Sequence, residues 1–473
     1  MQWYDIVRNS YSIIDLAKQD AMKRILILGA GRSSSSLIHY LLNNRQAYQW
    51  HITIADADET LAKEKAAGHV GVEAIKFDVF HEAQRGEEVK KADLVISMLP
   101  ATFHIHVAMS CLQYGKHLLT ASYISDEMRA LEKEIKAKNL LFLNECGLDP
   151  GLDHMTAMQV IDDLKEKGAE LLSFKSYTGG LIAPASDNNP WHYKFTWNPR
   201  NVVLAGQGTA RFIRNGSYKF IPYHKLFTRV EPITVEGFGN FEGYPNRDSL
   251  SYRKVYGLEA IPTMIRGTLR KEGYCSGWNI FVQLGMTDDS YVLENMENMT
   301  WRDFINAFLP YSATNDVESK LCKYVDIETD SEDFKKIAWL GLFDRAWVGL
   351  HKGTPAQVLQ KKLEEKWQLA ADDKDMIVMH HQFIYQLEGK LYQKDASLVT
   401  LGDDTQQTAM AKTVGLPLAI AAKMVLTGEI REEGVHIPII RKIYTPILEE
   451  LKAFGISCHE KETVLQEGVT SKP

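Results

Sequence analysis

The sequence predicts an α/β protein with a doubly wound parallel sheet, followed by a domain built on a mixed sheet. Three observations indicate this fold class. A short apolar run at 24–28 is followed at once by a glycine turn and then by apolar positions at helical spacing. Similar short runs alternate with helical patterns up to residue 144, which is typical of βαβ units. From residue 171 onward, aromatic residues and strand formers become frequent, which marks the second domain.

The glycine turn is the first candidate binding element. Its pattern is G-x-G-x-x-S, formed by Gly29, Gly31 and Ser34, so a serine stands where the usual fingerprint has its third glycine. Such a turn lets backbone N–H groups and a helix N-terminus approach a pyrophosphate. The sequence therefore predicts a dinucleotide site whose phosphate-binding residues are Gly29, Ala30, Gly31, Arg32, Ser33 and Ser34.

An acidic residue follows the second predicted strand, which covers 51–55. Asp56 stands 25 residues after Gly31, where a carboxylate accepts hydrogen bonds from a ribose 2′-hydroxyl. No arginine follows it directly, and its charge would repel a 2′-phosphate, so NAD is favoured over NADP. The alternative is an ordinary strand, turn and helix followed by a solvated aspartate.

The carboxyl ends of the later strands predict the rest of this site, because open α/β sheets bind ligands there. These strands are predicted at 74–79, 92–100, 116–123 and 140–144. His104 and His106 follow one of them, and we expect both to be partners within the fold rather than proton carriers. Asp78 is predicted either to contact the adenine or to cap the next helix. The further cofactor-binding residues predicted here are Asp78, Val79, Ser97, Met98, Leu99, Ala121 and Ser122.

Length and composition narrow the functional classes. The chain has 473 residues, 45% of them apolar and 24% charged, which suits two or three globular domains. A net charge of −7 and a pI of about 6.1 argue against general binding of nucleic acids or anionic membranes. The five cysteines are scattered without a C-x-x-C pair, so we expect neither a zinc site nor a disulfide framework, and the cytoplasm as location. No apolar run approaches the length of a membrane span.

The expected organisation has five parts. Residues 1–21 lack an apolar core, so we expect an N-terminal extension rather than a signal peptide, with translation able to start at Met22. The remaining parts are a dinucleotide-binding domain at 22–150, a mixed α/β substrate domain at 151–300 and 371–400, a helical subdomain at 301–370, and a C-terminal segment at 401–473.

Local patterns in the second domain suggest where a ligand meets the chain. Asp153 is placed to cap a helix that starts near His154. A loop of small residues at 179–184 would let a ligand approach the backbone. His380 and His381 are adjacent on a predicted strand, so they point to opposite faces, and we expect no shared metal site.

Four cations are available for an acidic substrate: Arg200, Lys225, Arg247 and Arg253. Arg247 lies on a predicted loop between Asn246 and Asp248. It either binds a carboxylate bidentately or belongs to a surface turn with local side-chain bonding. Since the sequence shows neither a metal triad nor a G-x-S-x-G elbow, it predicts a dehydrogenase or reductase whose second domain holds the substrate.

Several segments carry a resemblance to one family. They are Leu94–Pro100 with His104, Thr120–Tyr123, Asn144–His154, Tyr193–Trp197, Gly243–Ser249, Arg266–Arg270, Asp373–Met379 and Thr408–Leu416. Their order and spacing, within 23–455, are similar to those of the glutamate-forming saccharopine dehydrogenases, also called saccharopine reductases.

The resemblance implies a fold, a reaction and a substrate site. The fold is a variant Rossmann domain built from both chain ends, so 401–473 would return to it, with the mixed and helical domains between. The reaction is reversible oxidation of saccharopine to glutamate and 2-aminoadipate 6-semialdehyde, in lysine metabolism. The substrate site would comprise Ser97, Met98, Ser122, Tyr123, Arg200, Lys225, Asn246, Arg247 and Asp248.

The choice of cofactor and the identity of the proton acceptor depend on individual residues. Fungal members have an arginine after the second strand and use NADP, whereas Asp56 here resembles the NAD-using animal enzymes. The secondary amine of saccharopine must lose a proton, and Tyr123, Glu145 and Asp149 are the candidates by position, with a substrate carboxylate or an ordered water as alternatives.

Two other functions remain open at this point. One is a related reductive coupling of an amine to a semialdehyde, as in carboxynorspermidine dehydrogenase. The other is a non-catalytic NAD-binding sensor. A homodimer is the expected oligomer, since symmetric dimers are the commonest.

Overall fold

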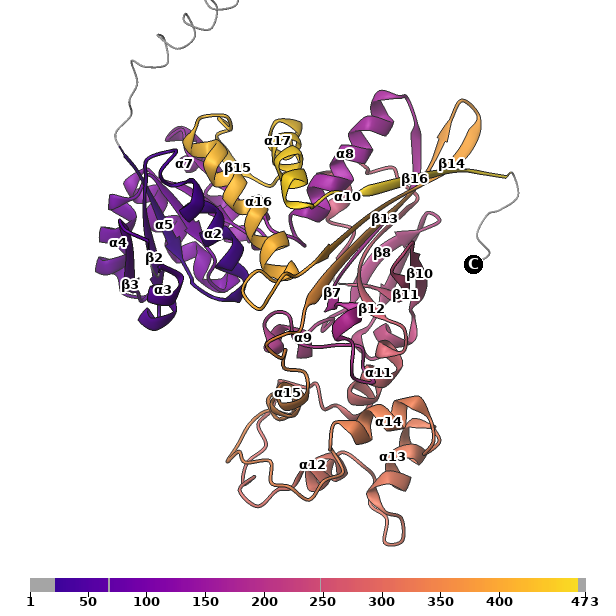
Figure 1. Cartoon of the computed structure of the whole chain (residues 1–473). Helices are drawn as coiled ribbons and strands as arrows, with labels where there is room; N and C mark the ends of the chain where they lie inside the picture. Colours follow the sequence, from indigo (N-terminus) through magenta and orange to yellow (C-terminus); the bar gives the residue numbers. More distant parts are fainter. Residues whose placement is uncertain (1–21, 67–68, 247, 467–473) are drawn as a thin grey trace, which may run out of the picture. The chain divides into compact units, whose positions relative to one another are not determined.

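Two units, each built on its own sheet, make up the part of the chain that the computed structural model describes, residues 22–66, 69–246 and 248–466 (Figure 1). The first unit contains the described residues up to Cys146 together with Leu418–Ile437. The second contains the described residues between Gly147 and Pro417 and those from Pro438 onward. The predicted extension at 1–21 lies outside the described residues.

The first unit holds a seven-stranded parallel sheet in the order β15-β6-β5-β4-β1-β2-β3. Without β15, the order β6-β5-β4-β1-β2-β3 is that of doubly wound dinucleotide-binding folds. The predicted fold class is therefore confirmed. The apolar runs of β1 and β4 are buried because helices cover a parallel sheet on its faces. The strands are β1 Lys23–Leu28, β2 Trp50–Asp56, β3 Val72–Lys76, β4 Leu94–Ser97, β5 His117–Thr120, β6 Leu141–Leu143 and β15 Gly434–His436.

The boundaries of one strand in this unit differ from the prediction. The third strand, expected at 74–79, begins and ends earlier, so Asp78 and Val79 lie in the turn beyond it. Leu131 separates α6 from α7. The helices are α2 Ser35–Asn44, α3 Glu59–Ala66, α4 Glu82–Lys91, α5 His104–Tyr114, α6 Asp126–Ala130 and α7 Glu132–Ala137.

The second unit holds a mixed sheet in the order β10-β11-β12-β7-β13-β14-β16, with β8 and β9 attached at β12. Only β12 and β7 run parallel among the paired strands described; the other pairs are antiparallel. The strands are β7 Glu170–Ile182, β8 Ala210–Arg214, β9 Ser217–Ile221, β10 Glu231–Val235, β11 Gly239–Pro245, β12 Thr263–Lys271, β13 Asp375–Leu387, β14 Lys390–Leu401 and β16 His459–Leu465.

The small residues expected to form a loop at 179–184 belong largely to β7, and protein atoms fill the space beside them. A Cβ on Gly179 would lie 2.7 Å from the carbonyl oxygen of Leu269. A Cβ on Gly180 would lie 2.7 Å from Cε of Met410. The glycines therefore allow close packing of neighbouring chain segments, and the expectation of an open loop was wrong.

Most helices of the second unit are gathered beside the sheet and at one end of it, where Figure 1 shows α12 to α15. These four helices share one apolar core with the strands, so they are packed continuously with the sheet. Helix α14 ends at Trp339, and α11 follows the end of β12 after a short turn. The helices are α8 Leu152–Glu166, α9 Pro199–Val203, α10 Tyr252–Val255, α11 Tyr274–Leu284, α12 Trp301–Ala307, α13 Val317–Val325, α14 Glu332–Trp339, α15 Pro355–Lys366 and α17 Arg441–Leu451.

The return of the chain to the first unit is shorter than predicted. Only Leu418–Ile437 belongs to that unit, whereas β16 pairs with β14 and α17 packs on α8. The predicted return at 401–473 therefore combines segments of both units. Ala409–Leu426 forms α16, which by length and composition alone is apolar enough to cross a membrane; 72% of that stretch is buried within the protein.

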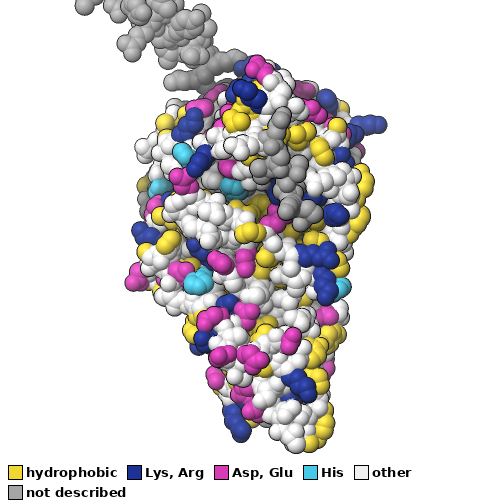
Figure 2. All heavy atoms as spheres, turned by 90° about the vertical axis from the view of Figure 1, so that its right-hand side faces the viewer, with side chains coloured by type: hydrophobic (Ala, Val, Ile, Leu, Met, Phe, Trp, Pro, Cys, Tyr) yellow, Lys and Arg dark blue, Asp and Glu magenta, His cyan; other side chains and the backbone are white. Residues whose placement is uncertain are grey.

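Charge is distributed over the surface without separation by sign on the face that Figure 2 shows. Acidic side chains are frequent over the helices at its lower end, beside lysines and arginines. This distribution accords with the modest net charge of −7.

Candidate functional site

The glycine turn after β1 is fixed by one glycine. Gly29 has a φ of +104°, and its N–H donates to the carbonyl of Ala55 at 2.8 Å. A Cβ at this position would lie 3.0 Å from the carbonyl oxygen of Met98, at the end of β4. Both the backbone conformation and the close approach therefore require glycine.

The other glycine of the turn leaves space for a ligand. Gly31 has a φ of −66°, which any residue adopts, and a Cβ there would have no protein atom within 4 Å. The Ser34 hydroxyl is buried and donates to the Gly31 carbonyl at 2.7 Å, so the serine that replaces the third glycine closes the turn. Arg32–Ser34 form a single helical turn that leads into α2. Open space before a helix N-terminus fits the pyrophosphate of a dinucleotide.

Asp56 lies beside this turn, as predicted. One carboxylate oxygen accepts the N–H of Ala30 at 2.7 Å, and the other accepts the N–H of Asp58 at 2.9 Å. Phe77 donates its N–H to the Asp56 carbonyl. The next residue, Asp78, therefore lies near the carboxyl end of β2 as well. Asp78 is exposed and accepts the N–H of Phe80, which is a turn-forming contact. The predicted adenine contact of Asp78 stays a prediction.

His104 connects the carboxyl ends of β4 and β5. Its Nδ1 lies 2.8 Å from the Ser97 hydroxyl, and its Nε2 lies 2.8 Å from the Ser122 hydroxyl and 3.1 Å from that of Thr120. Burial lowers the pKa of His104 to about 4. The imidazole is thus a neutral partner within the fold, and it holds in place two side chains predicted to contact cofactor and substrate.

Two of the three proton-acceptor candidates lie together in the first unit. Glu145 is buried, accepts the N–H of Ile124 at 3.0 Å and donates its own N–H to the Ser122 carbonyl at 3.0 Å. Tyr123 lies between these two contacts in the chain and is half-buried. The third candidate, Asp149, belongs to the second unit.

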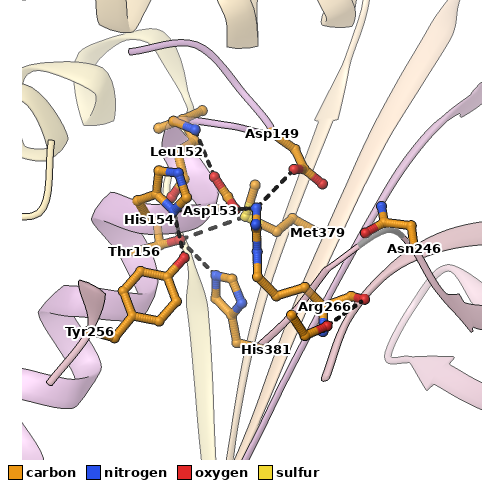
Figure 3. A network of polar contacts seen from close by, with 12 residues as sticks. Asp149, Leu152, Asp153, His154, Thr156, Asn246, Tyr256, Arg266, Met379 and His381 are labelled. Carbon is orange, nitrogen blue, oxygen red and sulfur yellow. Dashed lines mark hydrogen bonds and ion pairs between the residues drawn. The ribbon is translucent and has the colours of Figure 1, made fainter. Parts of the chain in front are cut away.

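In the second unit, Arg266 is bound by two carboxylates (Figure 3). Its Nη2 lies 2.5 Å from Oδ2 of Asp153 and 3.1 Å from Oδ1 of Asp149. Asp153 also accepts the Gly151 N–H at 2.6 Å. Burial alone would raise the pKa of Asp153, but the charges of His154 and Arg266 and the Gly151 N–H lower it overall. Asp153 was expected to cap a helix from His154; instead α8 begins at Leu152, and the carboxylate binds Arg266.

Tyrosine and histidine side chains surround this ion pair. His154 Nδ1 lies 2.5 Å from the Tyr256 hydroxyl, and the Arg266 guanidinium lies 4.1 Å from the centre of the Tyr252 ring. His381 Nε2 lies 2.8 Å from the Thr156 hydroxyl, and burial lowers the pKa of His381 to about 3. The network is therefore largely buried, and it combines the arginine and its two carboxylates with His154, Tyr256 and His381.

The adjacent histidines do face opposite sides of β13, as predicted. His380 contacts the Ser397 hydroxyl at 2.9 Å and lines a polar pocket of about 180 Å³ with Lys175, Tyr177 and Asp395. Within the described residues, no group of three or more His, Cys, Asp or Glu side chains is placed to hold a metal ion.

Of the four predicted cations, the three that the structure describes do not converge on one site. Arg200 forms an ion pair with Asp289, and Arg253 donates to the carbonyl of Glu259 and the hydroxyl of Tyr218. Lys225 is exposed on a short turn before β10. Arg247 lies outside the described residues. A cation that does meet other polar groups is Arg266, which contacts Asp149 and Asp153. The sequence places it within a segment that resembles the family but predicts no role for it.

The two neighbours of Arg247 are nevertheless tied to the same strand region. The Asn246 side chain donates to the Thr268 hydroxyl at 3.1 Å, and its N–H donates to the Arg266 carbonyl at 3.1 Å. Asp248 accepts the N–H of Leu250 at 2.8 Å, a turn-forming contact. Figure 3 shows Asn246 beside the network that contains Asp149 and Arg266.

A parallel sheet with a dinucleotide-type turn, joined to a mixed sheet with a buried acid–arginine network, defines a two-domain dinucleotide-binding protein. Two family models match the chain: "Saccharopine dehydrogenase NADP binding domain" at 25–143 and "Saccharopine dehydrogenase C-terminal domain" at 147–456. The chain belongs to the saccharopine dehydrogenase family.

The chain is similar to relatives of about its own length and to relatives about twice as long. "Saccharopine dehydrogenase [NADP(+), L-glutamate-forming]" of Saccharomyces cerevisiae is 34% identical, over 93% of this chain and 99% of that protein. "Alpha-aminoadipic semialdehyde synthase, mitochondrial" of Mus musculus is 36% identical over 97% of this chain, which spans about half of that relative's length, 50%. The solved apo structure of the Saccharomyces cerevisiae enzyme matches with a TM-score of 0.84 and 33% identity, covering 93% of this chain and 100% of that one.

The comparisons confirm a nicotinamide nucleotide site in the first unit. The matched model and the fungal relatives are named for NADP, so the names favour NADP over the NAD predicted from Asp56.

Proposed function

We propose that the chain catalyses the reversible oxidation of saccharopine by NAD(P)⁺. Hydride leaves the lysine-derived ε-carbon, the secondary amine loses a proton, and water hydrolyses the resulting imine. The products are L-glutamate, 2-aminoadipate 6-semialdehyde and NAD(P)H, with one proton released. The observation that carries this proposal is the match to fungal enzymes named for this reaction along 99% of their length.

The nicotinamide nucleotide supplies the hydride acceptor when bound, and the chain's own residues must place it. Gly29 holds the turn in shape, Gly31 leaves room for the pyrophosphate, and Asp56 lies at the end of β2 where a ribose binds. Ser97 and Ser122, fixed by His104, lie at the strand ends where the nicotinamide half of such a cofactor rests.

The second unit is proposed to bind the substrate. Asn246 and Arg266 share one region of the sheet, and the two carboxylates on Arg266 fix its guanidinium. Asp149 is the one of the three candidates that lies in this region of the second unit, with Oδ1 3.1 Å from Nη2 of Arg266. We therefore favour Asp149 over Tyr123 and Glu145 as the acceptor for the proton of the secondary amine.

The test is a direct assay with purified full-length chain, saccharopine and either NAD⁺ or NADP⁺. Growth of the reduced-nicotinamide absorbance together with glutamate as product is the expected result. An Asp149→Asn variant should lose kcat most strongly at low pH, where amine deprotonation limits the rate. No reduction of either cofactor, by protein shown to bind NADH, would contradict the proposal.

The relatives support this function over the alternatives considered from sequence. The matches named above are to saccharopine dehydrogenases and semialdehyde synthases, so a carboxynorspermidine dehydrogenase-like coupling and a non-catalytic sensor are not favoured. The homodimer and the cytoplasmic location stay predictions, which light scattering on the purified chain and cell fractionation would test.

A further inference from the structure

Arg270, near the end of β12, is a buried cation with few partners. The residue is 4% exposed, and its guanidinium donates one hydrogen bond, from Nη1 to the Leu269 carbonyl at 3.0 Å. Its Nε atom is buried without a hydrogen-bond partner. The rings of Tyr193 and Tyr274 lie 5.4 and 5.3 Å from the guanidinium carbon. Aromatic faces compensate part of the charge, but a buried guanidinium normally requires an anion.

The carboxylate on the residue that pairs with Arg270 across the sheet already binds other groups of the protein. Glu242 on β11 lies directly opposite Arg270 in the antiparallel pairing. Its two oxygens accept the N–H groups of Gly273 and Cys275, each at 2.9 Å, at the start of α11. Among the described residues no carboxylate lies within 4.0 Å of the Arg270 guanidinium. The charge of Arg270 is therefore left for an anion that does not belong to the chain.

The position of Arg270 on the strand indicates which anion. Side chains alternate along a strand, so Arg266, Thr268 and Arg270 share one face of β12. Thr268 holds Asn246, and Arg266 holds Asp149 and Asp153. These three residues form a polar row along one face of the strand. Arg270 lies at one end of the row, roughly 13 Å along the strand from Arg266 at about 3.3 Å per residue.

Two buried hydroxyls near this row also lack hydrogen-bond partners. Thr178 on β7 pairs in register with Thr268, so it faces the same side of the sheet. The hydroxyl of Thr196 would lie 3.1 Å from a Cβ on Gly180, two residues further along β7. Neither hydroxyl oxygen has a partner in the structure. A row with an unpaired cation and two unpaired hydroxyls fits a bound molecule that carries a carboxylate.

We propose that Arg270 binds a carboxylate of the substrate. The inference rests on the proposed function, since saccharopine combines glutamate, with two carboxylates, and the semialdehyde, with one. An extended molecule with carboxylates at both ends needs cations that are separated along the site. Arg266 is neutralised by two acids, whereas Arg270 is not, so Arg270 is the residue with charge available for the ligand.

The experiment compares Arg270→Met and Arg270→Lys with wild type in the full chain. Arg270→Met should raise KM for saccharopine about tenfold to a hundredfold, leave KM for the nucleotide within about twofold, and lose the rise in Tm that saccharopine gives wild type. Its Tm without ligand should not fall, because an uncompensated buried charge has been removed. Arg270→Lys should restore part of the affinity for saccharopine. Lysine keeps the positive charge but lacks the planar guanidinium that binds a carboxylate through two parallel hydrogen bonds.

The matched control is Lys271→Met. Lys271 is the next residue, faces the other side of β12 and donates to the Phe238 carbonyl, so KM for saccharopine should stay within about twofold of wild type. An unchanged KM in Arg270→Met, or a fall in its unliganded Tm with no change in saccharopine binding, would assign Arg270 a purely structural role and overturn the proposal.

Binding measured without turnover keeps this test separate from that of the reaction. If wild type binds saccharopine but reduces no cofactor, the proposed function fails, while the loss of binding in Arg270→Met still supports the carboxylate site. If wild type binds no saccharopine, the proposal fails. Equal Tm rises with sodium phosphate and saccharopine, both lost in Arg270→Met, would assign the site to an inorganic anion and also overturn it.

Discussion

Nη2 of Arg266 lies 2.5 Å from Oδ2 of Asp153, and the two side chains are 7% and 1% exposed. The residues are 113 positions apart in the chain, and their contact joins α8 to the middle of the mixed sheet. A buried ion pair of this kind is costly to break, because removal of one partner leaves a charge without compensation. The pair therefore couples the stability of the second unit to the segment that carries Asp149.

Breaking this pair from the arginine side should destabilise the chain strongly. We expect Arg266→Met to lower the free energy of unfolding by about 3–5 kcal/mol, since Asp153 is left buried and charged. The double variant Arg266→Met with Asp153→Asn should recover a large part of that loss, because the fully buried carboxylate is gone and only the partly exposed Asp149 remains there. Denaturant unfolding measures both changes; purely additive losses in the double variant would contradict the coupling.

The two glycines of the nucleotide turn should respond differently to the same substitution. Gly29→Ala places a Cβ 3.0 Å from the Met98 carbonyl oxygen at a φ of +104°, so we expect a loss of about 1–3 kcal/mol in stability. Gly31→Ala meets no protein atom, so its Tm should match wild type while KM for the nucleotide rises about tenfold. Thermal unfolding and nucleotide titration measure the two effects. An unchanged nucleotide KM in Gly31→Ala would show that the space beside it does not hold the pyrophosphate.

The first unit could be predicted closely because its signals are local. Gly29, Gly31 and Asp56 lie within one strand-turn-helix-strand unit, where spacing alone places them together. The end of the chain could not be divided correctly, because pairing of β16 with β14 and of β15 with β6 depends on contacts distant in sequence. Patterns within 401–473 contain no signal that separates these partners.

The substrate side was predicted less well for a physical reason. Cations such as Arg200 and Arg253 are conspicuous in the sequence, yet they lie on the short helices α9 and α10 and bind neighbouring groups of the fold. Arg266 and Arg270 are two of three alternate residues in a strand, a pattern that reports only a shared face. Which of them is neutralised depends on Asp153 and Glu242, whose positions are set by tertiary structure.

Asp56 should set the preference between the two nicotinamide nucleotides. Its carboxylate, held by the Ala30 N–H, would repel a 2′-phosphate, so we predict a higher kcat/KM with NADH than with NADPH. Asp56→Ser should shift the ratio of the two values toward NADPH by about tenfold, or roughly 1.4 kcal/mol. The matched control is Asp58→Ser, which removes an exposed acid that accepts the Thr60 N–H at 2.9 Å. A wild-type enzyme that works better with NADPH would agree with the names of its relatives and refute this interpretation of Asp56.

His104 should make the chain less stable as the pH falls. Burial lowers its pKa from 6.5 to about 4, so between these values the unfolded chain binds a proton that the folded chain does not. The free energy of unfolding then decreases as the pH falls, and this histidine alone accounts for roughly 1.6 kcal/mol between pH 6.5 and 5, because the slope grows from about half of 1.36 kcal/mol per pH unit at pH 6.5 to nearly the full value at pH 5.

His104→Gln should remove that contribution while it keeps groups able to bond with Ser97 and Ser122. Denaturant unfolding at pH 6.5 and pH 5 should therefore show a smaller difference for the variant than for wild type, whatever its stability at neutral pH. The assay must follow the first unit, for which Trp50 on β2 is a buried reporter. Equal differences for both proteins would mean that the folded and unfolded chains protonate the imidazole over the same pH range, which would refute the lowered pKa of His104.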